Sequence, residues 1–246
     1  MKPWPKEKLT QLLNDLEKHR PKERAVAAFD ADGTLWDLDL GEGLFLHQIK
    51  HRLVELPEDP WAHYEWLKKS KGNPAAYLWL AQVNKGMALS QVQAWAEQAV
   101  KEMEPIPFYE EQQRIIEKLR SLQVEIFIVT ASIKWAVEPG ARRLGFKNEQ
   151  VLGIETEVDS QGLVTDRQNG VITYREGKAE ALLKRTGGLR PYFASGNTEG
   201  DKWLLECATH LRLVMSSAKA EQHLYITEKV MLDLAERNGW YSHRYL

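Results

Sequence analysis

The chain has 246 residues, 43% of them hydrophobic, which is enough for a sizeable core in one domain with an insertion or in two modest domains. This content excludes a disordered chain, and a formal net charge of −2 provides no basic field that would attract nucleic acid. The single cysteine, Cys207, cannot form an internal disulfide, which favours a reducing compartment.

The sequence predicts a soluble cytoplasmic protein without a membrane partner. Its amino-terminal segment lacks the apolar core of a signal peptide, and no segment approaches the ~20 consecutive apolar residues of a membrane span. Nothing in the sequence indicates an oligomeric state.

The first predicted elements are an amphipathic helix that ends near Pro21 and a buried strand that follows Arg24. The strand ends in two acids, Asp30 and Asp32, and Gly33 breaks it at once. Because side chains alternate along a strand, both carboxylates can face the same side, at the edge where open α/β sheets bind ligands. The alternative is an ordinary Asp-Gly turn with both acids in solvent.

Two neighbouring carboxylates can take different catalytic roles. Close like charges push their pKa values apart, so that one stays ionised as a nucleophile or metal ligand and the other holds a proton as a general acid.

The stretch from Trp36 to about Glu104 lacks strand-like alternation and has helical spacing throughout, which predicts an all-helical insertion. Ser90 and Gln93 resemble a capping box. The predicted helices cover residues 43–53, 61–70, 74–83 and 90–103.

After the insertion, helices and apolar strands alternate, which predicts a Rossmann-like, doubly wound parallel α/β sheet. The expected core segments are 1–37 and 108–246, and the insertion is 38–107. The predicted strands cover residues 124–129, 151–157 (continuing into a hairpin), 191–195 and, as the last core strand, 211–215. The predicted helices cover 108–122, 135–144, 177–185 and 221–237, and another carries Leu204 and Leu205.

Several polar residues follow or begin these later elements. Thr130 and the backbone of Ala131 come directly after a strand and can hold an anion, Lys178 begins a helix, and residues 196–201 offer oxygen ligands to a hard cation. Taken singly, each has an ordinary alternative as a turn residue or a solvated charge.

Taken in order, these segments resemble the four motifs of the haloacid dehalogenase superfamily: Asp30-x-Asp32-Gly33-Thr34, then Thr130, Lys178 and the stretch 196–201. Val-Thr-Ala-Ser and Glu-Gly-Lys-Ala-Glu are similar to its phosphoserine phosphatase-like branch. The resemblance implies a Rossmann-like core with a helical cap between the first two motifs.

The resemblance further implies a Mg²⁺-dependent phosphatase of a small-molecule phosphomonoester that works through an aspartyl-phosphate. Asp30 would be the nucleophile, Asp32 the acid/base, and Thr130, Ala131 and Lys178 the phosphate ligands. The implied metal ligands are Asp30, Asp32 through its carbonyl, Asn197 and Asp201. Phosphoryl transfer needs such neutralisation of negative charge.

Two residues refine this expectation. Hydrolytic dehalogenases of this kind lack an acid at the place of Asp32, so Asp32 points to an alkoxide leaving group. Asn197 departs from the usual Gly-Asp of the fourth motif, because an amide oxygen can ligate Mg²⁺ but brings no charge. A phosphomutase and a non-catalytic phosphometabolite-binding protein are the alternatives.

The substrate expectation rests on the aromatic residues of the insertion. Trp36 together with Asp39 or Glu42 can form a pocket for an ammonium group, as in phosphoserine-, phosphoethanolamine- or phosphocholine-like substrates. Packing is the alternative role of these rings. His47 and His51, one helical turn apart, suggest zinc, but no third ligand with suitable spacing accompanies them, and a solvated face is the expectation.

Overall fold

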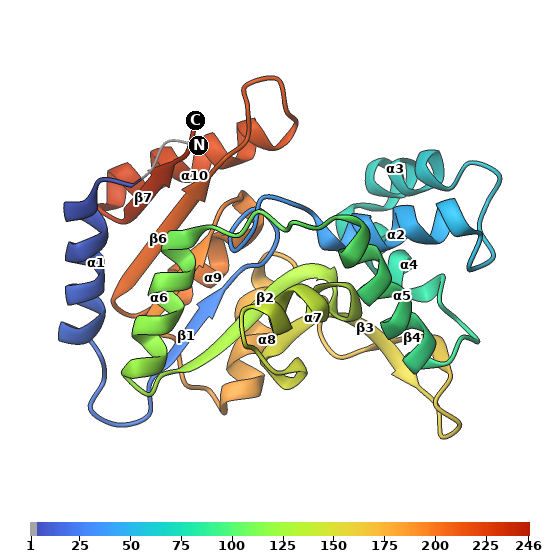
Figure 1. The fold of residues 1–246 in the computed structure, drawn as a ribbon, viewed down its shortest axis with the longest axis horizontal. Helices are drawn as coiled ribbons and strands as arrows, with labels where there is room; N and C mark the ends of the chain where they lie inside the picture. Colours follow the sequence, from blue (N-terminus) through green and yellow to red (C-terminus); the bar gives the residue numbers. More distant parts are fainter. Residues whose placement is uncertain (1–3) are drawn as a thin grey trace. The chain divides into compact units, whose positions relative to one another are not determined.

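The computed structural model describes residues 4–246 and has an α/β fold with a seven-stranded sheet in the order β4-β3-β2-β1-β5-β6-β7 (Figure 1). The strands are β1 Val26–Phe29, β2 Glu125–Ile133, β3 Val151–Val158, β4 Val164–Asn169, β5 Phe193–Gly196, β6 Leu211–Ser216 and β7 Tyr241–Arg244. β1 pairs in parallel with β2 and β5, β5 with β6, and β6 with β7, whereas β3 and β4 form an antiparallel hairpin.

The predicted α/β fold with a mostly parallel sheet is confirmed, and a helical region separates β1 from β2. The helices are α1 Lys6–Lys18, α2 Leu40–His51, α3 Pro60–Lys71, α4 Asn73–Gln82, α5 Leu89–Glu102, α6 Glu110–Ser121, α7 Lys134–Arg143, α8 Glu176–Thr186, α9 Lys202–Cys207 and α10 Leu224–Asn238, with short 3-10 helices η1 Asn148–Gln150 and η2 Glu199–Asp201. Within residues 4–246, no helix combines the length and apolar character needed to cross a membrane.

The chain divides into two compact units. The first comprises the residues up to Leu38, Pro107–Val129 and Arg175–Leu246, and the second comprises Asp39–Ile106 and Thr130–Tyr174. The second unit therefore contains α7, β3 and β4 as well as the inserted helices. The predicted boundaries instead assign residues 130–174 to the core segment 108–246. The assignment of domains therefore stays a prediction. Residues 1–3 of the predicted core lie outside the described range.

The first unit is built around strands that are buried along their whole length. Every residue of β1 and β5 is buried, which is why β1 is apolar throughout and β5 contains only apolar or small residues, without alternation. α1 and α6 lie side by side, and α10 packs on β6 and β7 (Figure 1). β1 and β5 pair in parallel, so their carboxyl ends, where the acidic residues follow, lie at the same edge of the sheet.

The core of the second unit consists of rings and aliphatic side chains from its helices, α7 and the hairpin. Phe45 lies 5.5 Å from Trp79 and 5.9 Å from Tyr64, ring centre to ring centre, in edge-on geometry. Most of the aromatic residues of the insertion thus pack against one another, as expected for a small helical body.

Three local predictions are wrong. β2 does not end before Thr130 but runs on to Ile133, since Thr and Ile favour extended backbone. β6 is not the last strand. Gly239 adopts a left-handed backbone conformation that ends α10, and the chain after it forms β7, which pairs with β6.

The third wrong prediction is the capping box. α5 begins at Leu89, not at Ser90, and no side chain caps it. The Leu89 N–H donates instead to the carbonyl of Gly162, and Ala88 pairs with Leu163 of the same unit. Backbone of the hairpin thus satisfies the helix start, and the hydroxyl of Ser90 is not needed for it.

Candidate active site

Asp30 stands directly after β1 and is held by backbone and side chain. Its N–H donates to the carbonyl of Ser195 on β5 at 2.9 Å, and its Oδ2 accepts from the hydroxyl of Thr34 at 3.0 Å. Gly33 turns the chain with φ +74°, a conformation that side-chain-bearing residues rarely adopt. The tight turn brings Thr34 back to the carboxylate, which is 5% exposed.

Lys178 lies between two carboxylates. From the first turn of α8, its Nζ is 2.5 Å from Asp30 Oδ1 and 2.5 Å from Asp201 Oδ1, and all three side chains are buried. Burial alone would lower the pKa of Lys178, but the two carboxylates raise it, so the amine stays charged. The family resemblance selected these three residues for one site, and the structure brings them together, but the resemblance did not indicate that Lys178 pairs with both carboxylates.

The Asp30 carboxyl is strongly perturbed. Burial, followed by repulsion from Asp201, raises the pKa of Asp30 to about 7, against the opposing effect of Lys178. Three acids of this unit, Asp30, Asp32 and Asp201, accompany one lysine, so the site carries an excess of negative charge.

The loop after β5 carries Asn197 and Asp201. Oδ2 of Asp201 accepts the N–H groups of Asn197 and Thr198 at 3.0 and 2.9 Å, and the Thr198 hydroxyl at 3.2 Å. Gly196 permits this closeness, because a Cβ there would lie 2.5 Å from the Cβ of Asp201. One oxygen of Asp201 thus shapes the loop while the other faces Lys178.

Glu228 of α10 completes the surroundings of Asn197, and sequence reasoning missed it. Its Oε1 accepts from Asn197 Nδ2 at 3.1 Å, and its Oε2 accepts from the Ser216 hydroxyl and from the N–H groups of Ser217 and Ala218. The side chain is 1% exposed. An acid at i, with the buried Met231 and Ala235 at i+3 and i+7, is the signal that indicates a buried carboxylate.

The amide of Asn197 is therefore oriented. Its Nδ2 points to Glu228, and its Oδ1 accepts from the Thr34 hydroxyl at 3.3 Å. The Oδ1 oxygen thus contacts Thr34 of the Asp30 loop, and it is the atom of this amide that could ligate a metal.

Asp32 is held by Trp36 through a 2.8 Å hydrogen bond from the indole Nε1 to Oδ1. The Trp36 side chain is fully buried and packs edge-on against Phe108 at 5.9 Å between ring centres. The predicted substrate-binding ring thus packs in the core and fixes the second carboxylate.

The remaining predicted residues belong to the second unit. Thr130 is buried in β2, its hydroxyl accepts from the N–H of Ser132 at 3.0 Å, and its carbonyl accepts from Thr173; Ala131 follows it in the same strand. Asp39 caps α2 by accepting from the Glu42 N–H at 2.7 Å. Their roles toward a substrate stay predictions.

The donor atoms of the first unit fit Mg²⁺. Carboxylate oxygens of Asp30 and Asp201 and the amide oxygen of Asn197 are hard ligands. The backbone carbonyl of Asp32, in the loop that also carries Asp30, is a fourth oxygen. The excess of acids over Lys178 is the charge that a divalent cation would balance.

Comparison with known proteins agrees with this arrangement. A family model described as haloacid dehalogenase-like hydrolase matches residues 27–206, a range that begins in β1 and includes Lys178 and Asp201. The chain belongs to the haloacid dehalogenase-like hydrolases. No curated protein sequence matches it.

Solved structures share the fold of this haloacid dehalogenase-like hydrolase. A conserved protein of unknown function from Anaerococcus prevotii DSM 20548 has a TM-score of 0.74 at 15% identity, covering 96% of this chain and 91% of that chain. A phosphoserine phosphohydrolase-like protein from Francisella tularensis subsp. tularensis SCHU S4 has a TM-score of 0.56 at 14% identity, covering 90% and 95%. A phosphoserine phosphatase, solved as a phospho-aspartyl intermediate analogue, has a TM-score of 0.52 at 16% identity, covering 79% and 87%.

Proposed function

We propose that this haloacid dehalogenase-like hydrolase is a Mg²⁺-dependent phosphatase of a small phosphomonoester. The observation that carries the proposal is the buried Lys178 between Asp30 and Asp201, with Asp32 held by Trp36 in the same loop. In this proposal Asp30 supplies the nucleophile, Lys178 the charge-neutralising amine and Asp32 the second acid. The likeness to a phosphoserine phosphatase trapped as a phospho-aspartyl analogue supports the same chemistry.

In the proposed reaction, a carboxylate oxygen of Asp30 attacks phosphorus, the bond from phosphorus to the substrate oxygen breaks, and Asp32 donates a proton to the departing alkoxide. Water then attacks phosphorus of the aspartyl-phosphate while Asp32 takes its proton, the bond between the Asp30 oxygen and phosphorus breaks, and inorganic phosphate and the Asp30 carboxylate are released. Lys178 favours the ionised form of Asp30 and offsets the phosphate charge. A bound Mg²⁺, held by Asp30, the Asp32 carbonyl, Asn197 and Asp201, would neutralise further negative charge.

An amine-bearing substrate is the finer part of the proposal. In the second unit, Lys68 Nζ lies 4.0 Å from the ring centre of Tyr64 and 3.3 Å from Glu42 Oε1. A carboxylate beside an aromatic ring is an arrangement that binds an ammonium group, and here Lys68 of the chain itself occupies the place between Glu42 and Tyr64. Recognition of an amine by Glu42 therefore requires Lys68 to move, and Lys68→Met should raise the kcat/KM ratio of phosphoethanolamine to glycerol phosphate.

The deciding experiment is release of inorganic phosphate from a panel of phosphomonoesters. We expect turnover with Mg²⁺, none with excess chelator, and recovery when Mg²⁺ is restored. Asp30→Asn should abolish turnover while leaving the unfolding transition nearly unchanged, because size and hydrogen-bonding shape are kept. Transfer of the phosphoryl group within the substrate, without free phosphate, would instead indicate a mutase. Binding without turnover would indicate a carrier.

A further inference from the structure

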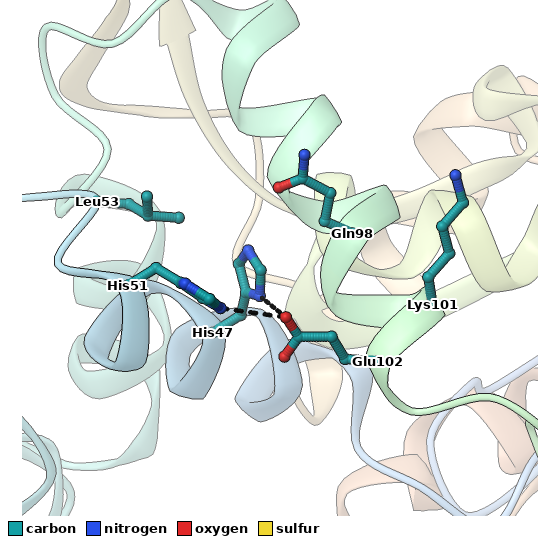
Figure 2. A pocket seen from close by; sticks show the side chains of 6 residues that line it. All are labelled: His47, His51, Leu53, Gln98, Lys101 and Glu102. Carbon is teal, nitrogen blue, oxygen red and sulfur yellow. Dashed lines mark hydrogen bonds and ion pairs between the residues drawn. The ribbon is translucent and has the colours of Figure 1, made fainter.

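Three side chains of the second unit converge on one point outside the candidate active site. His47 Nδ1 lies 3.3 Å and His51 Nε2 3.1 Å from the same oxygen, Oε1 of Glu102, and Figure 2 shows the three side chains directed toward one another. One ligand atom from each residue lies within 4.8 Å of the others. Glu102 supplies the third partner that the spacing of the histidines alone did not indicate.

Helix geometry explains the convergence. His47 and His51 are four residues apart on α2, so their side chains share one face, with ring centres 4.5 Å apart. Glu102 is the last residue of α5, and α2 packs against α5. The carboxylate thus approaches the histidine face from a different helix, 51 residues along the chain from His51.

His47 is the unusual member of this group. Its side chain is 5% exposed, yet within residues 4–246 neither ring nitrogen makes a hydrogen bond of acceptable geometry, although Nδ1 lies close to Glu102. A buried polar atom without a partner costs free energy, and such atoms point to a ligand when they face a pocket. The pocket here has a volume of about 320 Å³ and is lined by His47, His51, Leu53, Gln98, Lys101 and Glu102.

We propose that His47, His51 and Glu102 form a Zn²⁺ site that ties α2 to α5. Two imidazoles and one carboxylate are a known zinc donor set, with metal–ligand bonds of about 2.0–2.2 Å. Around a tetrahedral ion, bonds of that length separate neighbouring ligand atoms by roughly 3.4 Å. The two distances to Glu102 are already close to this value, and the pocket leaves room for water as the fourth ligand.

The charges around the site favour binding of Zn²⁺ by only one of the two carboxylate oxygens of Glu102. Lys50 Nζ binds the other oxygen, Oε2, at 3.0 Å, which orients the carboxylate and leaves Oε1 to the histidines. Lys50 and Lys101 oppose a second cation, so we expect one ion at this place. Imidazole nitrogens favour Zn²⁺ over Mg²⁺, which separates this site from the oxygen donors around Asp30.

The test is a titration of metal-free protein with Zn²⁺ alone, against a chromophoric chelator and in excess Mg²⁺ to occupy the oxygen site. Because His47 is buried and its removal can disturb folding, the exposed His51 and Glu102 carry the test. His51→Ala and Glu102→Gln should weaken zinc binding at least about tenfold. His223→Ala, an exposed histidine of the first unit, is the control and should bind as the wild type does.

Two further readouts make the outcome independent of phosphatase activity. Zn²⁺ should raise the Tm of the wild type and of His223→Ala, but not of His51→Ala, since only a ligand that binds the native state stabilises it. Cu²⁺ in the same place should give an electron paramagnetic resonance spectrum with imidazole nitrogen coupling, which the oxygen donors around Asp30 cannot produce. Equal zinc affinity and equal Tm shifts in wild type and His51→Ala would overturn the site, as would a copper spectrum without nitrogen coupling.

Discussion

The side-chain amide of Asn197 donates a 3.1 Å hydrogen bond to the carboxylate of Glu228, and this pair gives a physical reason for an amide at position 197. Both side chains are buried. A carboxylate at 197 would place two acceptors, both charged, against each other, whereas the amide supplies the donor that Glu228 Oε1 needs.

Asn197→Asp should therefore destabilise the fold, by about 1–3 kcal/mol, because a buried hydrogen bond is replaced by repulsion. Glu228→Gln should recover most of that loss in the double variant, since a glutamine amide at 228 can donate to the carboxylate introduced at position 197. Urea unfolding of the two single variants and the double variant measures the coupling. Losses that simply add would show that the pair does not interact.

Lys178→Met keeps most of the length of the unbranched side chain and removes its charge. We expect loss of phosphate release together with destabilisation by about 3–5 kcal/mol, because Asp30 and Asp201 would remain buried without their cation. Lys184→Met, on the exposed face of the same helix, is the matched control and should change neither property. A stable, active Lys178→Met protein would contradict the proposed role.

The hydrogen bond from Trp36 to Asp32 predicts a leaving-group effect. Trp36→Phe keeps a buried ring but removes the N–H that holds Asp32, so proton donation to an alkoxide should suffer more than departure of an aryl oxide, which needs little protonation. kcat/KM should fall at least about tenfold for an alkyl phosphate and less for an aryl phosphate. Asp32→Asn should show the same order more strongly. Equal losses on both substrates would remove Asp32 from the acid role.

Glu138 of α7 predicts a pH dependence of stability. The carboxyl is buried, burial raises its pKa above the ordinary 4.5, and its Oε2 lies 3.4 Å from Gln93 Nε2. The folded state therefore binds a proton that the unfolded state has released, so this group's contribution to stability falls as pH rises above 4.5. Glu138→Gln should raise Tm at about pH 8 and leave it unchanged at about pH 4. A Tm difference that does not vary with pH would contradict this.

The sequence pattern predicted most of the architecture, because β1 is a short apolar run, β5 and β6 are rich in apolar and small residues, and the inserted helices keep a regular spacing. β7, Tyr-Ser-His-Arg, has no such signal: its pairing with β6 depends on how α10 returns the chain. An isolated polar tetrapeptide does not reveal that contact.

The site residues likewise fall into those that the sequence indicates and those that only the folded structure reveals. Asp30, Asp32, Lys178 and Asp201 stand in local motifs that resemble those of a known family, so the sequence was enough to propose them as site residues. Glu228 has no motif, and its importance arises only from a contact with a residue 31 positions away. Glu102 is comparable, since its meeting with His47 and His51 depends on the packing of two helices.

The turn at Gly33 makes the residues allowed at positions 33, 197 and 228 depend on one another. A Cβ at 33 would lie 2.2 Å from Asn197 Nδ2, and that amide cannot swing aside without leaving Glu228. Any side chain at 33 therefore calls for a smaller residue at 197, and a smaller residue at 197 removes the donor that Glu228 uses. Among related sequences, positions 33, 197 and 228 should accordingly vary together, and a chain with an aspartate in place of Asn197 should carry a residue other than glutamate at 228.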